Sequence, residues 1–346
     1  MNPAAEHLAQ GQALEARGTP ESLAAALQCF DRALAMLRPV ARASEPESVR
    51  NLAVAWMNRG NVLQKLATPA ALADAVAAYD EAIVLLQPIA TVANLPAANS
   101  LGAAWLNRGH ALQSQEPPAH VEALRSYRAA IDILGQFPPG TDRSVTLNLA
   151  GAWMNLANAL LFPSAPDAPA ARTAALTALA LVVAQSETDA VAADLTLKSL
   201  RVQCDALGHL LVAAESDITT VRTFAQEAGD AADQGLALVR QWEARGFRHF
   251  RHLAARFHHF GAQLYLVHQP HFLAEFLLEP IDPEKGPGAI TDEPALHTFA
   301  VEYATRALEA LRATSLQGLT DYDRGRLVEA SQELQSALAR LPSLRP

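Results

Sequence analysis

The sequence predicts an all-α fold, a solenoid of antiparallel helical hairpins, and two observations lead to that prediction. Half of the 346 residues are hydrophobic, and alanine and leucine, which lose little conformational entropy in a helix, dominate them. A short segment, AWMNRGN at 55–61, nearly recurs as AWLNRGH at 104–110 and as AWMNLAN at 152–158. Self-similarity at a fixed period of this length is typical of helical-repeat proteins.

The glycine of the NRGN segment defines the first helix of each repeat. Equivalent small residues recur at intervals of 48–53 positions, at Gly11, Gly60, Gly109, Ala157, Gly208 and Gly261. This spacing predicts six units. The first helix of each unit therefore carries a small residue at one fixed position.

A second helix follows the first in each of the first three units. The segments 26–37, 75–86 and 123–134 share an alanine, an aromatic residue four positions later and another alanine three positions beyond. These spacings put all three residues on one helical face, where the alanines let a neighbouring helix approach and the ring fills the remaining volume. Pro39 and Pro88 then predict the ends of the first two of these helices.

These residues resemble the tetratricopeptide repeat. That family has a Trp, a small residue four positions later, then an alanine, an aromatic residue and an alanine on the second helix, and then a proline. The second and third units match it at Trp56, Gly60, Ala75, Tyr79, Ala82 and at Trp105, Gly109, Ala123, Tyr127, Ala130. The first unit matches the second-helix pattern at Ala26, Phe30 and Ala33.

The other units depart from the family pattern. His7 replaces the Trp of the first unit, and the fourth unit keeps Trp153 but has Ala175 in place of the aromatic residue. The fifth and sixth units have Cys204 and Phe257 at the Trp position. The resemblance implies a right-handed superhelix of antiparallel hairpins whose first helices line a concave face, closed by a C-terminal capping helix.

The resemblance divides one continuous solenoid into three stretches. Residues 1–185 form four clear hairpins, 186–315 form two degenerate hairpins with a loop insertion at 278–292, and 316–346 form the capping helix and tail. The 49-residue spacing exceeds the family period of about 34 residues. We attribute the excess to longer turns at 68–76 and 114–124, to linkers such as 42–49 and 91–100, and to longer helices.

Amide side chains recur on the predicted concave face. The rows contain Asn58, Asn107 and Asn155 with Met57 beside them, then Asn61, His110 and Asn158, and one turn further Gln64 and Gln113. A primary amide both donates and accepts, so it can hold a peptide bond of an extended chain at two points. The resemblance to peptide-binding tetratricopeptide proteins of the sugar-transferase and kinesin-light-chain type implies such an asparagine ladder. The alternative is that these amides satisfy polar groups of neighbouring helices and backbone.

Arg59 and Arg108 follow the ladder asparagines and stand where the family has leucine. They can contact an acidic ligand, or they can bury their stems and pair with an acidic residue of the adjacent helix. Another family mode, a clamp of basic residues on a terminal carboxylate, does not fit. The clamp positions hold Met57, Leu106 and Met154.

The segment 247–272 holds six of the eleven histidines. The repeat register puts His258 and His259 on the concave side, so we include them among the peptide-binding candidates. A competing hypothesis is a metal-binding or enzymatic protein centred on these two residues, although no HExxH or CxxC pattern supplies further zinc ligands. Arginines interleaved with aromatic residues could instead form an anion or nucleic-acid surface. The plainest interpretation makes the four phenylalanines core, namely Phe247, Phe250, Phe257 and Phe260.

The totals favour a binding protein over an enzyme. The net charge of −9 opposes nucleic-acid binding, and no P-loop, GxSxG or dinucleotide fingerprint is present. We therefore expect a non-enzymatic interaction scaffold with a protein or peptide partner, and no cofactor, metal, nucleic acid or membrane. A structural subunit that assembles through an outer apolar face is a third hypothesis, and the oligomeric state is open.

Cysteine usage and the N-terminus predict the compartment. Cys29 and Cys204 lie far apart inside apolar helical patterns, which predicts free, buried thiols. The N-terminal residues lack the basic and apolar pattern of a signal peptide, and the longest apolar run, 174–184, is too short to span a bilayer. We expect a cytoplasmic protein in which this run is a buried helix.

Overall fold

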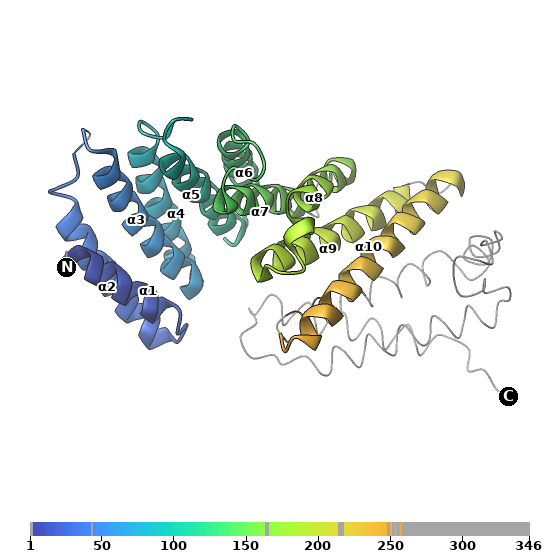
Figure 1. Cartoon of the computed structure of the whole chain (residues 1–346), viewed down its shortest axis with the longest axis horizontal. Helices are drawn as coiled ribbons and strands as arrows, with labels where there is room; N and C mark the ends of the chain where they lie inside the picture. The colour runs from blue at the N-terminus through green and yellow to red at the C-terminus, as the bar shows by residue number, and fades with distance from the viewer. Residues whose placement is uncertain are drawn as a thin grey trace. The chain divides into compact units, whose positions relative to one another are not determined.

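The computed structural model describes residues 3–42, 44–162, 166–213 and 218–247, together with residues 250, 253 and 257. These residues form ten α-helices and one short 3₁₀-helix, without a strand (Figure 1). The predicted all-α fold of helical hairpins is confirmed. The chain divides into two compact units, Met1–Pro166 with Ala180–Val182, and Asp167–Leu179 with Val183–Pro346.

The first unit contains three complete hairpins and one further helix. The hairpins are α1 (Pro3–Glu15) with α2 (Pro20–Leu37), α3 (Pro46–Leu66) with α4 (Pro69–Leu86), and α5 (Leu95–Gln113) with α6 (His120–Leu134), and α7 (Arg143–Leu160) follows them. Each second helix packs on the first helix of the next hairpin. The first helices also contact one another, α1 with α3, α3 with α5 and α5 with α7. The row of first helices predicted from the repeat is therefore present.

Threonine and proline set the ends of the second helices. Thr19 and Thr68 each accept a hydrogen bond at 3.2 Å from the backbone N–H three residues on. A proline follows each cap at the first helical position, where an N–H would lack a partner in any case. α2 and α4 end two residues before Pro39 and Pro88, as predicted.

The predicted long turns between the helices of a hairpin are wrong. α4 begins at Pro69, so almost all of 68–76 is helical, and α6 begins at His120, inside the predicted turn 114–124. The prolines there lie at or just before helix starts and do not lengthen a loop. The long repeat comes from long helices instead, with 21 residues in α3 and 19 in α5.

A glycine of the first helix meets an aromatic ring of the second helix in all three hairpins. The pairs are Gly11–Phe30, Gly60–Tyr79 and Gly109–Tyr127, and a Cβ on each glycine would lie 2.6, 2.7 and 2.6 Å from the nearest ring atom. All three aromatic side chains are completely buried. The repeat glycine is therefore required by the close approach of the ring.

The second unit is built on a long hairpin. It contains Asp167 and residues 168–179 of α8 (Ala168–Val182), the 3₁₀-helix η1 (Val183–Gln185), α9 (Ala190–Ala213) and α10 (Ile218–Ala244). α9 and α10 pack together and share a core with Phe250, Leu253 and Phe257. Trp242 of α10 donates from Nε1 to the Ser186 carbonyl oxygen at 2.8 Å, which ties the end of the hairpin to the segment after η1.

Two of the four phenylalanines predicted as core are buried, namely Phe250 and Phe257. Phe247 is 46% exposed, so its assignment to the core is wrong. It follows the end of α10 and Gly246, whose φ of +89° turns the chain, and its ring packs edge-on against Trp242. Phe260 lies outside the described residues. Cys29 and Cys204 are free and buried, as predicted.

Ala168–Gln185 is, among the described residues, the one stretch long and apolar enough to cross a membrane, and 33% of it is buried. A core helix passes the same test of length and composition. Arg172 within this stretch donates to Glu227 of α10 through Nε at 2.8 Å and through Nη2 at 2.5 Å. The alanines of one face are buried, namely Ala171, Ala174, Ala175 and Ala178, whereas Leu176 and Val183 are exposed, so the stretch is buried along one face and not all round.

Several predicted features lie outside the described residues. They are the sixth hairpin with His258 and His259, the loop insertion at 278–292 and the capping helix at 316–346.

Candidate functional site

The predicted site residues of the first unit lie on three neighbouring helices. α3 packs on α5 and α5 packs on α7. We call the surface formed by their candidate residues the inner face. It comprises Met57, Asn58, Asn61 and Gln64 of α3, Asn107, His110 and Gln113 of α5, and Asn155 and Asn158 of α7.

The hydroxyl of Tyr79 is the centre of a polar chain between α3 and α5. Its oxygen lies 2.8 Å from Asn61 Oδ1 and 3.0 Å from Gln64 Oε1. Asn107 Nδ2 lies 3.1 Å from Asn61 Oδ1, and Gln64 Nε2 contacts His110 Nδ1. We call these five side chains the tyrosine seam. The seam joins two consecutive hairpins on the inner face.

The third hairpin repeats the bond between tyrosine and glutamine. Tyr127 donates from its hydroxyl to Gln113 Oε1 at 2.8 Å. Burial raises the pKa of both tyrosines, and at Tyr79 the charge of Glu15 adds to the effect. Both hydroxyls therefore stay protonated, and a buried hydroxyl needs a partner.

The first hairpin shows what happens without a hydroxyl. Phe30 takes the place of the tyrosine, and Glu15 stands where the other hairpins have glutamine. Glu15 pairs instead with Lys65 of α3 at 2.7 Å. The glutamine is thus present in those hairpins whose buried ring carries a hydroxyl.

The predicted amides therefore differ in how they are used. Asn61, Gln64 and Gln113 have partners inside the protein, as the alternative interpretation of the amide rows expects. Asn155 makes no hydrogen bond through its side chain within the part of the chain that the structure describes. Asn58 carries a buried Nδ2 that has no hydrogen-bond partner among the residues described. Asn155 and Asn58 are therefore the residues of the row whose amide groups lack a partner within the described part of the chain.

A second amide row, which was not predicted, joins α5 to α7. Asn148 Nδ2 donates to Asn99 Oδ1 at 2.9 Å, and Asn99 Nδ2 donates to Ser144 Oγ at 3.1 Å. Asn99 and Asn148 are 49 residues apart, which is the repeat period. This spacing is the signal in the sequence that could have identified them.

Arg59 and Arg108 each hold a carboxylate on the second helix of the preceding hairpin. Their Nε atoms lie 2.9 Å from Asp31 Oδ1 and 2.6 Å from Asp80 Oδ1. Arg108 also donates from Nη1 to Ser126 Oγ at 2.9 Å. Both guanidinium groups lie over the tryptophan ring of their own helix, at 5.9 and 5.6 Å from its centroid. The structure shows the pairing with an adjacent helix that was the alternative to anion binding.

The inner face carries no Asp, Glu, Lys or Arg among its defining residues. Lys65, one position after Gln64, is neutralised by Glu15. The described residues contain no group of three His, Cys, Asp or Glu side chains that could hold a metal ion. The inner face can therefore bind a ligand through hydrogen bonds between uncharged groups and through apolar contacts.

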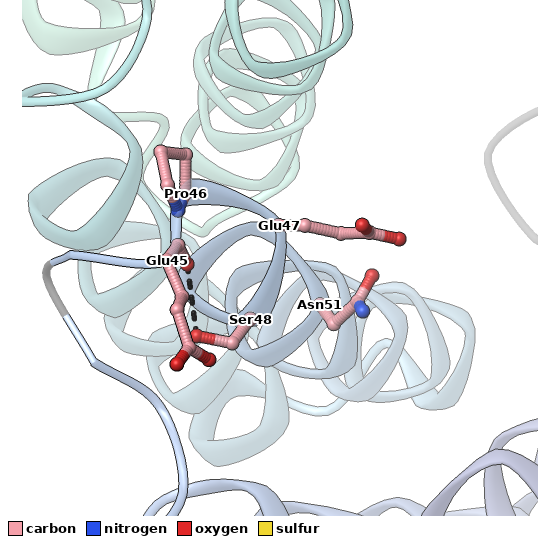
Figure 2. Close-up of a pocket in the computed structure, with 5 residues that line it drawn as sticks. All are labelled: Glu45, Pro46, Glu47, Ser48 and Asn51. Carbon is pink, nitrogen blue, oxygen red and sulfur yellow. Dashed lines mark hydrogen bonds between the residues drawn. The ribbon is translucent and has the colours of Figure 1, made fainter.

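A shallow hollow lies at the start of α3 (Figure 2). It is lined by Glu45, Pro46, Glu47, Ser48 and Asn51. Ser48 donates from Oγ to the Glu45 carbonyl oxygen at 2.8 Å, which accounts for the orientation of that hydroxyl. The hollow holds two carboxylates at an exposed helix end and lies apart from the amide rows in the sequence.

Comparison with known proteins identifies the class of fold. No protein-family model matches the chain, and no curated protein matches it. A crystal structure described as the apo form of RapI is similar over 97% of this chain and 99% of that chain, with a TM-score of 0.56 and 11% identity. BtubC from P. vanneervenii is similar over 85% and 94%, with a TM-score of 0.49 and 13% identity. The likeness to RapI concerns the fold alone, and with the hairpins it makes this chain an all-α helical-repeat protein.

Proposed function

We propose that this chain is a non-enzymatic scaffold of the tetratricopeptide type that holds an extended segment of a protein partner on its inner face. The observation that supports this most is the buried Nδ2 of Asn58, a donor without an acceptor in the described part of the chain. Such a group costs about 1–3 kcal/mol while it stays unpaired. Asn58 as a whole is half-buried, so rotation of its side chain can bring the amide to a ligand carbonyl.

The chemistry of the face indicates which kind of segment fits. A primary amide matches the N–H and C=O of a peptide bond, so a row of amides can bind backbone without regard to side chains. Met57 adds a flexible apolar contact. Because the defining residues carry no carboxylate, lysine or arginine, the proposed partner segment is extended and uncharged. The setting we propose is the cytoplasm, with no cofactor, nucleic acid or membrane.

A displayed library of random 15-residue peptides tests the proposal. Selected peptides are synthesised and their affinity is measured by calorimetry against wild type and against Asn58→Ala/Asn107→Ala/Asn155→Ala. One hydrogen bond contributes about 0.5–1.5 kcal/mol, so the triple variant should bind at least about 10-fold more weakly. Asn99→Ala is the matched control, because it removes an amide of the second row on the same helices.

Backbone recognition has its own signature. Methylation of the peptide nitrogens that meet the face should abolish binding, whereas exchange of neutral side chains should change it little. Failure to select any peptide, or equal binding to wild type and the triple variant, would contradict the proposal. Circular dichroism and the melting temperature show whether the variant keeps its fold.

A further inference from the structure

The tyrosine seam has more acceptors than its central hydroxyl can serve. The Tyr79 oxygen lies within hydrogen-bond distance of both Asn61 Oδ1 and Gln64 Oε1, yet it carries a single proton. An amide oxygen and nitrogen exchange places when the side chain turns by 180° about its last bond. One of the two amides must therefore be turned so that its nitrogen donates to Tyr79. This requirement leaves two complete arrangements.

The first arrangement begins with a proton on His110 Nδ1. That nitrogen donates to Gln64 Oε1, and Gln64 Nε2 donates to the oxygen of Tyr79. The Tyr79 hydroxyl then donates to Asn61 Oδ1, which also accepts from Asn107 Nδ2. Asn107 has used its donor end, so its Oδ1 is the atom left for a ligand.

The second arrangement runs in the opposite sense. Gln64 Nε2 donates to an unprotonated His110 Nδ1, and the Tyr79 hydroxyl donates to Gln64 Oε1. Asn61 is turned, so its Nδ2 donates to the Tyr79 oxygen and to Asn107 Oδ1. Asn107 has now used its acceptor end, and its Nδ2 is the atom left for a ligand.

We propose that the proton on His110 Nδ1 selects between these arrangements and thereby sets the polarity that Asn107 presents on the inner face. A charged imidazolium donates from both nitrogens, so it is compatible with the first arrangement alone. Histidine changes charge within the range of about pH 5–8. Lower pH therefore makes Asn107 an acceptor, suited to ligand N–H groups, and higher pH admits the donor form. The effect on ligand binding rests on the proposed function. The coupling of His110 to Asn107 through the chain of hydrogen bonds does not depend on that function.

The other members of the seam are neutral, so His110 is its only member that gains charge in this range. α5 packs against α3, α4, α6 and α7. Lys65, beside Gln64, is paired with Glu15, and Arg108 is paired with Asp80. The charged and titratable groups on the four neighbouring helices are Glu47, Arg50, Arg59 and Lys65; Asp74, Tyr79, Asp80 and Glu81; His120, Glu122, Arg125, Tyr127, Arg128 and Asp132; and Arg143. α7 thus contributes one charge, at its first residue.

Side-chain nuclear magnetic resonance on the ligand-free full chain tests the coupling. The protein is labelled with ¹⁵N at Asn, Gln and His, and the Asn107 amide signals are followed with the His110 ring signals from pH 5 to 8. We expect both to shift with one common midpoint, although Asn107 is bonded to Asn61 and the seam contact of His110 is with Gln64.

Tyr79→Phe is the decisive variant because it removes the central hydroxyl and keeps the ring. Phe30 already fills the equivalent place against Gly11, so the variant has a packing precedent in the same chain. In it the His110 ring should still titrate while the Asn107 signals stop moving. His110→Asn should also leave the Asn107 signals constant across this range. The proposal is overturned if Asn107 does not titrate in wild type, or if it follows His110 with full amplitude in Tyr79→Phe.

The peptide experiment is separate from this one. If no peptide binds while Asn107 follows His110 through Tyr79, the proposed function fails and the coupling stands. If selected peptides bind but Asn107 ignores His110, the coupling fails and the scaffold proposal stands.

Discussion

Replacement of Gly60 by alanine tests whether the buried ring sets the distance between the two helices of a hairpin. The new Cβ would lie 2.7 Å from Cε1 and 2.9 Å from Cζ of Tyr79. Carbon atoms in good contact are about 3.5–4.0 Å apart. The ring is completely buried and its hydroxyl is held by Asn61 and Gln64, so it cannot turn aside without loss of those bonds.

The size of the effect follows from two opposing terms. Overpacking of a well-packed core costs about 1–3 kcal/mol, and a ring held at its hydroxyl end favours the upper part of that range. Alanine in a helix interior is better than glycine by about 1 kcal/mol. For Gly60→Ala we therefore expect a net loss of about 2 kcal/mol, which is about 30-fold in the local opening equilibrium.

Hydrogen exchange of the α3 and α4 amides measures this local opening without the assumption that the array unfolds in one step. Gly229→Ala in α10 is the matched control, because no atom of the described residues beyond its own stretch of helix lies within 4 Å of a Cβ placed there. That variant should slow exchange in α10, since it gains helix propensity and meets no neighbour. Unchanged or slower exchange in α3 of Gly60→Ala would refute the steric explanation.

Four further predictions concern other parts of the chain. Ala67 has a φ of +53° at a position equivalent to Gly18. Ala67→Gly should therefore stabilise the fold by about 0.5–1 kcal/mol and raise the melting temperature. A lower melting temperature would contradict this prediction. Burial raises the pKa of the Cys204 thiol, so mass spectrometry should find it unreactive toward iodoacetamide at pH 8 until the protein unfolds; rapid native labelling would disprove this. Burial and a neighbouring aspartate raise the pKa of Asp233, so folding disfavours its charged form. Urea titrations should therefore show Asp233→Asn more stable at pH 7, with the advantage fading as the pH falls toward about 4. Burial alone would raise the pKa of Glu227, but hydrogen bonds from an arginine and a glutamine, together with the arginine charge, lower it. Glu227→Gln should therefore be less stable than the wild type at pH 7, and the difference should shrink in acid. A gain in stability at pH 7 would contradict the pairing.

Helix ends were predictable where a single residue determines them, and mispredicted where its role depends on its neighbours. Pro39 and Pro88 follow the ends of α2 and α4 because proline cannot continue a helix. Pro69 lies in the predicted turn 68–76, yet it opens α4 because Thr68 caps the helix before it. A proline after a threonine or an aspartate indicates a helix start.

The sequence predicted which residues lie on the inner face, but not the hydrogen bonds among them. The repeat register located Asn61 and Gln64 on one side of α3. Their partner is the hydroxyl of Tyr79 on α4, and the register alone does not show that contact. One signal was available: glutamine occurs in the two hairpins with tyrosine, whereas the hairpin with Phe30 has Glu15 instead.

The alanine-rich interfaces explain why so many polar side chains hold hairpins together. Alanine lets two helices approach closely, but its short side chain interlocks little with a neighbouring helix. Apolar packing alone therefore fixes the register of neighbouring helices weakly. Directional bonds supply what is missing, through Arg108 with Asp80, through the tyrosine seam and through Asn99 with Asn148.

Polar residues committed to this role are poor candidates for ligand contact, because a ligand would have to break a bond that aligns two hairpins. Asn58 and Asn155 make no such bond, and Asn107 keeps one end of its amide. In the triple variant, therefore, most of the lost affinity should come from Asn58 and Asn155, and the single Asn107→Ala variant should also loosen the contact between α3 and α5.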